Sequence, residues 1–168
     1  MNSHLRLILA TVLAFAATVQ AEEKNGLSLT VSKTVIEKND PRTGSFSERI
    51  NRTQGLKASI KNLSFKEMPE GEIVWTILVK KYYSTTVESY TGTEKLKALK
   101  PAEITELVFG AAQITGYRDT DNSWKDKTEW QITVKQDGKE IIKSQSTSAF
   151  DGMAKHAIKG GKTTRADN

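Results

Sequence analysis

Apolar and polar residues alternate with a period of two along much of the chain after residue 26, which is the pattern of half-buried β-strands. Leu27, Leu29 and Val31 alternate with hydroxyl residues, and the stretch 56–62 repeats the same rhythm. No stretch of the sequence keeps a helical period over several turns. The pattern therefore predicts a protein built from β-strands.

The stretch 73–84 is the most apolar of the expected strands. Val74 and Leu78 add apolar side chains to the face opposite the main apolar row. A strand that is apolar on both faces is typical of a central, covered position in a sheet. The main row has four members, Ile73, Trp75, Ile77 and Val79.

The last alternating stretch breaks at Asp137-Gly138, a pair that favours a tight hairpin turn because both residues tolerate positive φ. Two registers are compatible with the pattern. A two-residue loop pairs Val134 with Ile141, whereas a three-residue loop pairs Val134 with Glu140. A change from one register to the other turns the side chains of the second strand to the opposite face of the sheet.

Turn residues interrupt the alternation about every 8–12 residues, which divides the chain into seven or eight short antiparallel strands. Such a series forms a sandwich or a barrel, and we interpret the fold as an all-β sandwich. The chain has no cysteine, so no disulfide joins the two sheets.

Residues 1–21 have the order of a secretory signal peptide: a charge at Arg6, a short apolar run, and small residues before Glu22. We expect cleavage after Ala21, a β-sandwich domain at 22–150, and a basic, flexible tail at 151–168. The apolar run is shorter than the roughly 20 residues of a membrane-spanning helix. The protein is therefore expected to be exported to the periplasm, the outer surface or the medium, with no transmembrane segment.

Composition narrows the function further. The absence of cysteine in an exported protein indicates a bacterial origin and excludes thiol chemistry. Removal of residues 1–21 leaves 24 Lys and Arg against 20 Asp and Glu. This bias is too small and too dispersed for nucleic-acid binding, which needs a concentrated basic stripe.

Catalytic groups are scarce. His156 is the only histidine after residue 21, and it lies in the expected tail, so no Ser-His-Asp arrangement or zinc site can form around a histidine in the domain. Glu103 with Glu106, or Asp119 with Asp121, could be paired for hydrolysis, but a small sandwich offers no deep cleft. We predict that the protein is not an enzyme and needs no cofactor.

One loop has alternating oxygen ligands, which suit calcium. The candidate ligands are Asp119, Asp121, Ser123 and Asp126. Trp124 occupies the position of the glycine in an EF-hand loop, so the pattern fits a polar turn better than an EF-hand.

Four aromatic residues are candidates for a binding surface. Exposed aromatic side chains bind sugars or proteins because they bury a large area at a low cost in conformational entropy. The candidates are Tyr82, Tyr83, Tyr90 and Trp124, whereas Trp75 and Trp130 are assigned to the core.

Three motifs resemble those of immunoglobulin-like and fibronectin-III-like sandwiches. The stretch GEIVWTILVKK resembles the middle strand with an inward tryptophan, here Trp75. The stretch LKALKPAEITEL resembles a turn that leads into a middle strand, and WQITVKQDGKEIIKSQS is similar to the closing hairpin. The cysteine pair of antibody domains is missing.

The whole chain resembles small exported immunoglobulin-like proteins of bacteria, some of them associated with type IV pilus-like gene clusters of a mucus-dwelling gut commensal. The resemblance implies a non-catalytic interaction or assembly module at the cell surface, with a protein or glycan partner in the envelope or in host mucus. One alternative is a carbohydrate- or ligand-binding module that uses the exposed aromatic residues. A second alternative is a small hydrolase that uses two carboxylates.

Overall fold

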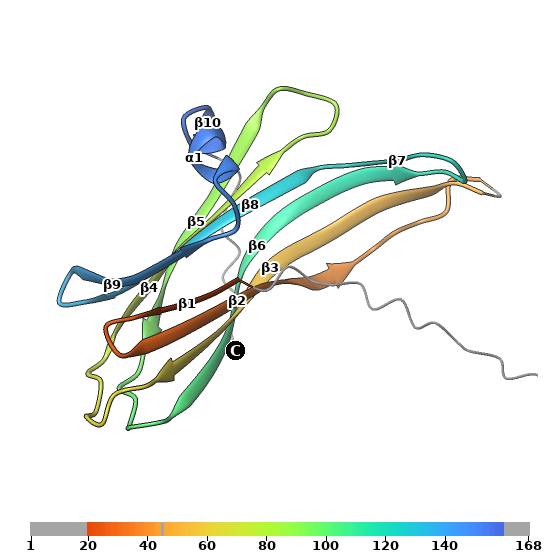
Figure 1. Ribbon diagram of the computed structural model, residues 1–168. Helices are drawn as coiled ribbons and strands as arrows, with labels where there is room; N and C mark the ends of the chain where they lie inside the picture. The colour runs from red at the N-terminus through yellow and green to blue at the C-terminus, as the bar shows by residue number, and fades with distance from the viewer. Residues whose placement is uncertain (1–19, 45, 160–168) are drawn as a thin grey trace, which may run out of the picture.

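The computed structural model describes residues 20–44 and 46–159 and shows two β-sheets that pack face to face (Figure 1). The first sheet has the order β1(Gln20–Lys24), β2(Leu27–Lys38), β3(Glu48–Asn62), β6(Ile104–Arg118), β7(Ser123–Lys125). The second has the order β10(Ala157–Lys159), β5(Val87–Leu96), β4(Gly71–Lys80), β8(Lys127–Gln136), β9(Lys139–Gln145). A short helix, α1(Ala149–Ala154), joins β9 to β10. The expected all-β sandwich is confirmed.

The described residues form ten strands, where seven or eight were expected. The long strands alternate between the sheets, with β2, β3 and β6 in one sheet and β4, β5, β8 and β9 in the other. These seven strands cross between the sheets as the Greek-key connections of an immunoglobulin-like sandwich do. The short strands β1, β7 and β10 extend the edges, and β10 runs parallel to β5.

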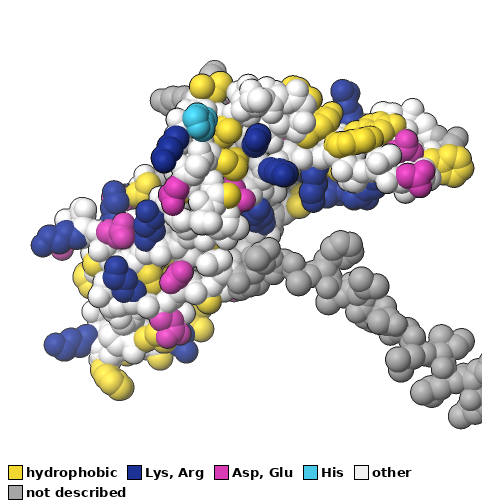
Figure 2. All heavy atoms as spheres, turned by 45° about the horizontal axis from the view of Figure 1, so that its top comes forward, with side chains coloured by type: hydrophobic (Ala, Val, Ile, Leu, Met, Phe, Trp, Pro, Cys, Tyr) yellow, Lys and Arg dark blue, Asp and Glu magenta, His cyan; other side chains and the backbone are white. Residues whose placement is uncertain are grey.

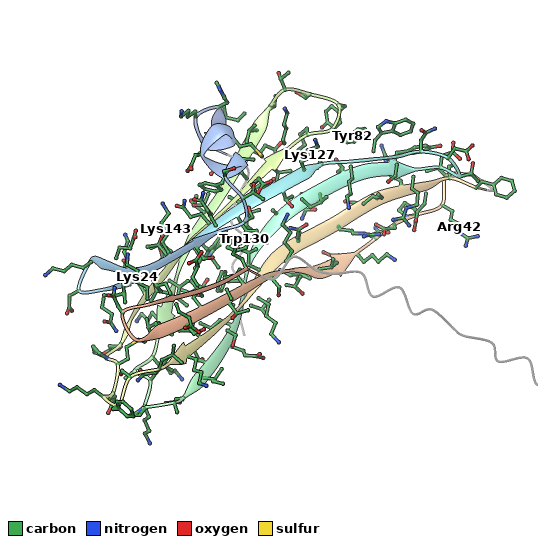
Figure 3. The ribbon with its side chains drawn as sticks, in the orientation of Figure 1. Lys24, Arg42, Tyr82, Lys127, Trp130 and Lys143 are labelled. Carbon is green, nitrogen blue, oxygen red and sulfur yellow. The ribbon has the colours of Figure 1, made fainter. Side chains whose placement is uncertain are left out.

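The core lies between the sheets and contains the apolar rows that the alternation identified. β4 is the central strand of its sheet, as expected, and Trp75 is 5% exposed. The ring of Trp75 stacks on Phe109 of β6, with 6.2 Å between centroids. Gly92 of β5 lies against the same indole. A Cβ atom added at this position would approach Trp75 Cζ2 to 2.4 Å, so there is room only for glycine. Trp130 is buried between the sheets (Figure 3).

The closing hairpin begins with the two-residue loop, one of the two expected alternatives, but the pairing of Val134 differs from both expectations. Asp137 and Gly138 form a two-residue turn with φ values of 49° and 74°. A bulge at Ile141 follows the turn, and it shifts the pairing so that Val134 faces Ile142. Both of these residues are fully buried, so the bulge places two apolar side chains opposite each other in the core.

The domain extends beyond residue 150, where the flexible tail was expected to begin. Phe150 and Met153 of α1 pack on Leu78 and Val87, and this contact covers Leu78 on the second apolar face of β4. Residues 160–168 lie outside the described residues, as do residues 1–19 of the expected signal peptide. The expected cleavage point, after Ala21, falls within β1.

The two sheets have unequal lengths, and this difference creates an open end. β3 and β6 have 15 residues each, whereas β4 and β8 have 10 each. The pairing of β3 with β6 starts at Glu48 and Arg118, while the pairing of β4 with β8 ends at Lys80 and Lys127. Figure 1 shows β3, β6 and β7 projecting past the second sheet. The sheets separate there.

Candidate functional site

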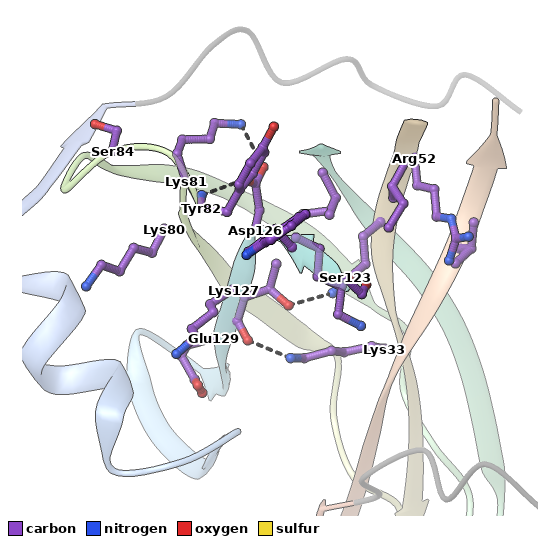
Figure 4. A pocket seen from close by; sticks show the side chains of 17 residues that line it. Lys33, Arg52, Lys80, Lys81, Tyr82, Ser84, Ser123, Asp126, Lys127 and Glu129 are labelled. Atoms are coloured by element: carbon purple, nitrogen blue, oxygen red, sulfur yellow. Dashed lines mark hydrogen bonds and ion pairs between the residues drawn. The ribbon is translucent and has the colours of Figure 1, made fainter. Parts of the chain in front are cut away.

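A groove of about 760 Å³ lies between the sheets at this open end (Figure 4). One wall comes from β2, β3, β6 and β7, and the other from β4, β8 and the loop that follows β4. Pockets that bind small ligands have volumes of roughly 300–1,000 Å³. The groove is therefore large enough for a small ligand or a short segment of a polymer.

Hydrogen bonds between the sheets close the inner end of the groove. Lys33 Nζ donates to the carbonyl oxygen of Thr128 at 2.5 Å, and Gln54 Nε2 donates to Thr128 Oγ1 at 3.2 Å. Arg52 lies on the same face of β3 and donates from Nε to Asp40 Oδ2 at 2.8 Å. This hydrogen bond from Arg52 lowers the pKa of the Asp40 carboxyl below its usual value.

A buried ion pair forms the floor of the groove. Lys81 Nζ lies 3.2 Å from Asp126 Oδ2, and the Asp126 side chain is fully buried. Asp126 also accepts hydrogen bonds from the backbone N–H groups of Tyr82 and Thr115, at 3.0 and 2.9 Å. Thr115 Oγ1 donates to the same carboxylate at 3.0 Å. Each carboxylate oxygen is satisfied, so the charge is stabilised in spite of its burial.

The ion pair between Lys81 and Asp126 could have been predicted from the sequence, but it was not among the expected features. Lys81 continues the inward row of β4 beyond Val79, and Asp126 precedes the inward row of β8. Because Lys80 pairs with Lys127, the next opposed positions are Lys81 and Asp126. Opposite charges at the ends of two inward rows on neighbouring strands indicate a buried ion pair.

Tyr90, the third predicted aromatic residue, lies in the buried network around Lys81. It pairs with Ile77 across β4 and β5, and its side chain is only 6% exposed. Its hydroxyl donates to Glu88 Oε2 at 2.8 Å, and Glu88 lies 3.4 Å from Lys81 Nζ. Burial, together with the hydrogen bond to Glu88, raises the pKa of Tyr90 to about 12.

Two of the four predicted aromatic residues meet at the groove. Tyr82 follows β4, and Trp124 lies in β7 of the other sheet. Both line the groove, and they are 45% and 50% exposed. Tyr83 makes an edge-to-face contact with Tyr82 at 5.1 Å, and Tyr117 stacks on Trp124 at 6.2 Å. The four rings therefore form two contacting pairs. One residue of each pair, Tyr82 or Trp124, lines the groove.

The surface around the groove combines aromatic and basic side chains. Figure 2 shows large hydrophobic side chains gathered toward the projecting end, with Lys and Arg side chains next to them. Figure 3 shows Tyr82 and Lys127 near this end of the molecule. Tyr83 is 69% exposed but does not line the groove. The aromatic surface available to a ligand is therefore centred on Tyr82 and Trp124.

The four calcium candidates have separate roles in the structure. Asp126 is bound to Lys81, and Ser123 lies on the groove wall. Asp119 Oδ1 accepts a hydrogen bond from the backbone N–H of Thr120 at 2.7 Å, and Asp121 is exposed. Within residues 20–44 and 46–159, no group of three or more His, Asp or Glu side chains is arranged to hold a metal ion.

Two carboxylates line the groove, Asp126 and Glu129, and both are held by protein groups. Glu129 Oε2 accepts hydrogen bonds from Ser146 Oγ and from Thr147 Oγ1, the latter at 2.9 Å. Neither pair considered for hydrolysis lines the groove: Glu103 and Glu106 lie at the start of β6, where Glu106 forms an ion pair with Lys57, and Asp119 and Asp121 lie in the loop before β7. His156 is exposed beside β10.

Basic residues around the groove are the feature that the sequence analysis did not select. Among the described residues, six Lys and Arg residues and two acids line it. Lys80, Lys125 and Lys127 form no ion pair with the described residues. In the sequence, Lys125 and Lys127 flank Asp126, and Lys80 ends the apolar strand, so a local cluster was visible.

No protein-family model and no curated protein matches this sequence. A crystal structure of a protein from Akkermansia muciniphila aligns with a TM-score of 0.36 and 12% identity, over 83% of this chain and 84% of that chain. A TM-score this low does not define a common topology, so the fold assignment rests on the strand order. Among the described residues, no helix is long and apolar enough to span a membrane.

Proposed function

We propose that this protein is a non-catalytic binding module that holds its ligand in the groove at the open end of the sandwich. The observation that supports this function is the position of Tyr82 and Trp124. They come from opposite sheets, are about half exposed, and line one groove. Aromatic side chains with an exposed face and a braced position offer a large binding area at a low entropic cost.

The absence of catalysis is part of the proposal and is supported by the state of the two acids. Asp126 is buried in an ion pair with Lys81, and Glu129 is bound by two hydroxyl groups. A general acid or base must be free to exchange a proton with the substrate. Both carboxylates instead maintain the walls of the groove.

The proposed location is the cell envelope or the surface of a bacterium. The N-terminal segment has the order of a signal peptide, and the chain contains no cysteine. An association with pili is suggested only by the resemblance of the whole chain to small exported immunoglobulin-like proteins of bacteria. Fractionation of the source cells, with detection of the protein in periplasm, outer membrane and medium, tests this part of the proposal.

The binding function can be tested by a fluorescence titration of the purified protein against a panel of glycans and peptides. Trp124 is half exposed in the groove, whereas Trp75 and Trp130 are buried. A ligand in the groove is therefore expected to change the emission of Trp124. The Trp124→Phe variant should lose this signal, and Tyr82→Ala should weaken binding by about tenfold, which corresponds to roughly 1.4 kcal/mol.

The matched control is Phe65→Ala. Phe65 is fully exposed in the connection between β3 and β4, at the opposite end of the sandwich. Its removal should leave binding unchanged. Binding that is lost in Phe65→Ala but retained in Tyr82→Ala would place the site elsewhere, and release of cleaved products from any bound glycan would overturn the non-catalytic assignment.

A further inference from the structure

We propose that the groove binds an acidic glycan: a chain of sugar rings that carry carboxylate or sulfate groups. This inference rests on the proposed function and names the class of ligand for the same site. The aromatic rings provide the contact with the sugar rings, and the unpaired lysines around the groove provide the contact with the anionic groups.

The charge around the groove favours an anion. Asp126 neutralises Lys81, and Asp40 neutralises Arg52. Three of the remaining basic groups, Lys80, Lys125 and Lys127, have no acidic partner within 4.0 Å among the described residues. Lysine ammonium groups are point charges on flexible stems, so they can follow anionic groups at several positions along a polymer.

Two of these lysines are directly opposed in the sheet. Lys80 of β4 and Lys127 of β8 are cross-strand partners. Like charges at directly opposed positions destabilise a sheet. Figure 4 shows Lys80 extending away from Asp126. It leaves β4 on the face that carries Leu78, so it reaches the outer edge of the groove from that side. An anion bound near this edge would relieve the repulsion.

Two basic residues, Lys33 and Lys125, also lie close to each other in the groove, with the carboxylate of Glu129 near Lys33. Lys33 uses its amino group to bond the carbonyl oxygen of Thr128, a neutral acceptor. Burial lowers the pKa of Lys33; Glu129 opposes this effect, and the nearby positive charge of Lys125 adds to it. Lys33 and Lys125 come from β2 and β7, so positive charge is brought to the groove from two strands.

The kind of apolar surface favours sugar rings over peptide side chains. Ile50 and Ile114 are already buried under the groove, with 2% and 5% of their surface exposed. The apolar surface that a ligand meets is therefore provided by the flat rings of Tyr82 and Trp124 and by the smaller side chain of Val35, which is 51% exposed. Peptide ligands gain specificity from pockets for individual side chains, whereas flat aromatic faces suit the C–H faces of sugar rings.

The experiment is a calorimetric titration of the full chain, expressed with its N-terminal segment, against four polymers. Polygalacturonate and dextran sulfate carry anionic sugar rings, dextran has neutral rings, and polyglutamate has anionic groups without sugar rings. We expect both acidic glycans to bind at least tenfold more tightly than dextran and polyglutamate. Added salt should weaken binding, because it screens charges in the open groove.

Two triple variants separate the site from general charge effects. Lys80→Gln, Lys125→Gln and Lys127→Gln together remove the unpaired lysines of the groove and should weaken binding of acidic glycans at least tenfold. The control combines Lys97→Gln, Lys139→Gln and Lys143→Gln, three exposed lysines that do not line the groove. It removes the same charge and should bind like the parent protein. Unfolding curves of both variants confirm that they are folded.

Each result has a defined meaning. Equal binding of dextran and polygalacturonate, with loss in Tyr82→Ala, overturns the preference for anions and leaves the binding function in place. Tighter binding of polyglutamate than of the acidic glycans would identify an acidic peptide as the ligand and would overturn the proposal of a glycan ligand. Equal losses in the two triple variants would show nonspecific attraction between charges. Binding that Tyr82→Ala and Trp124→Phe leave intact would overturn the proposed function as well.

Discussion

Lys81 and Asp126 form a buried ion pair that joins the end of β4 to the start of β8, with 3.2 Å between Nζ and Oδ2. Lys81 Nζ also donates to the carbonyl oxygen of Gln113 in β6, at 3.3 Å. The pair therefore links both sheets at the point where they begin to separate. The same interaction forms the floor of the groove.

Replacement of one partner of this pair should destabilise the fold strongly. We expect Asp126→Ala to lower the free energy of unfolding by roughly 3–5 kcal/mol, because Lys81 would keep only Glu88 as a counter-charge and the buried N–H groups of Tyr82 and Thr115 would lose their acceptor. Urea denaturation measures this change. Asp121→Ala, at an exposed position of the preceding loop, should stay within about 0.5 kcal/mol of the parent protein. A loss below about 1 kcal/mol for Asp126→Ala would contradict the role of the pair.

A methyl group at Gly92 should disturb the packing of Trp75. The Cβ atom of Gly92→Ala would lie 2.4 Å from Trp75 Cζ2, so the indole and its stacking partner Phe109 must move. Overpacking of this kind costs about 1–3 kcal/mol, which thermal unfolding can measure. Gly152→Ala in α1 is the matched control, since a Cβ atom there meets nothing within 4 Å. It should be neutral or slightly stabilising.

The stability of the protein should fall at high pH because of Tyr90. Its pKa is raised from 10.0 to about 12, so the folded state keeps the phenolic proton after the unfolded chain has lost it. This contribution is complete below pH 10 and is lost as the pH rises toward 12. We expect the stability of the parent protein to fall more steeply across this range than that of Tyr90→Phe. An absorbance titration should show one tyrosine that ionises near pH 12 and is missing in the variant.

We expect the turn of the closing hairpin to require glycine at position 138 because of its backbone conformation and not because of side-chain packing. Gly138 has φ of 74°, and a Cβ atom there would contact nothing within 4 Å. Gly138→Ala should therefore cost about 1–2 kcal/mol through backbone strain. Gly138→Asn should cost less, because asparagine tolerates positive φ. Equal losses in the two variants, measured by urea denaturation, would show that the strain does not control the turn.

The site was partly visible in the sequence. Tyr82 and Trp124 were selected as exposed aromatic residues, and the structure brings them to one groove. Tyr90 was selected for the same reason but is buried, because the register with β4 places it opposite Ile77. Alternation predicts which residues share a face of one strand, whereas cross-strand partners depend on register.

The bulge at Ile141 is a second example of a register that the sequence pattern did not predict. The turn residues Asp137 and Gly138 indicated a tight turn, and the structure has one. The sequence pattern allowed two registers, and neither contained the bulge that pairs Val134 with Ile142. A bulge is stabilised by the packing of its neighbours in the core, so local pattern alone does not locate it.

The sequence by itself determined the all-β class, the inward rows of the long strands and the central position of β4, because side-chain alternation is a local property of extended chain. Tertiary structure alone decided the unequal lengths of the two sheets, the groove between them and the pairing of Lys81 with Asp126. These features depend on which strands become neighbours across the sandwich and where their pairing stops. Residues distant in sequence, such as Lys33 and Thr128, meet only when the two sheets pack.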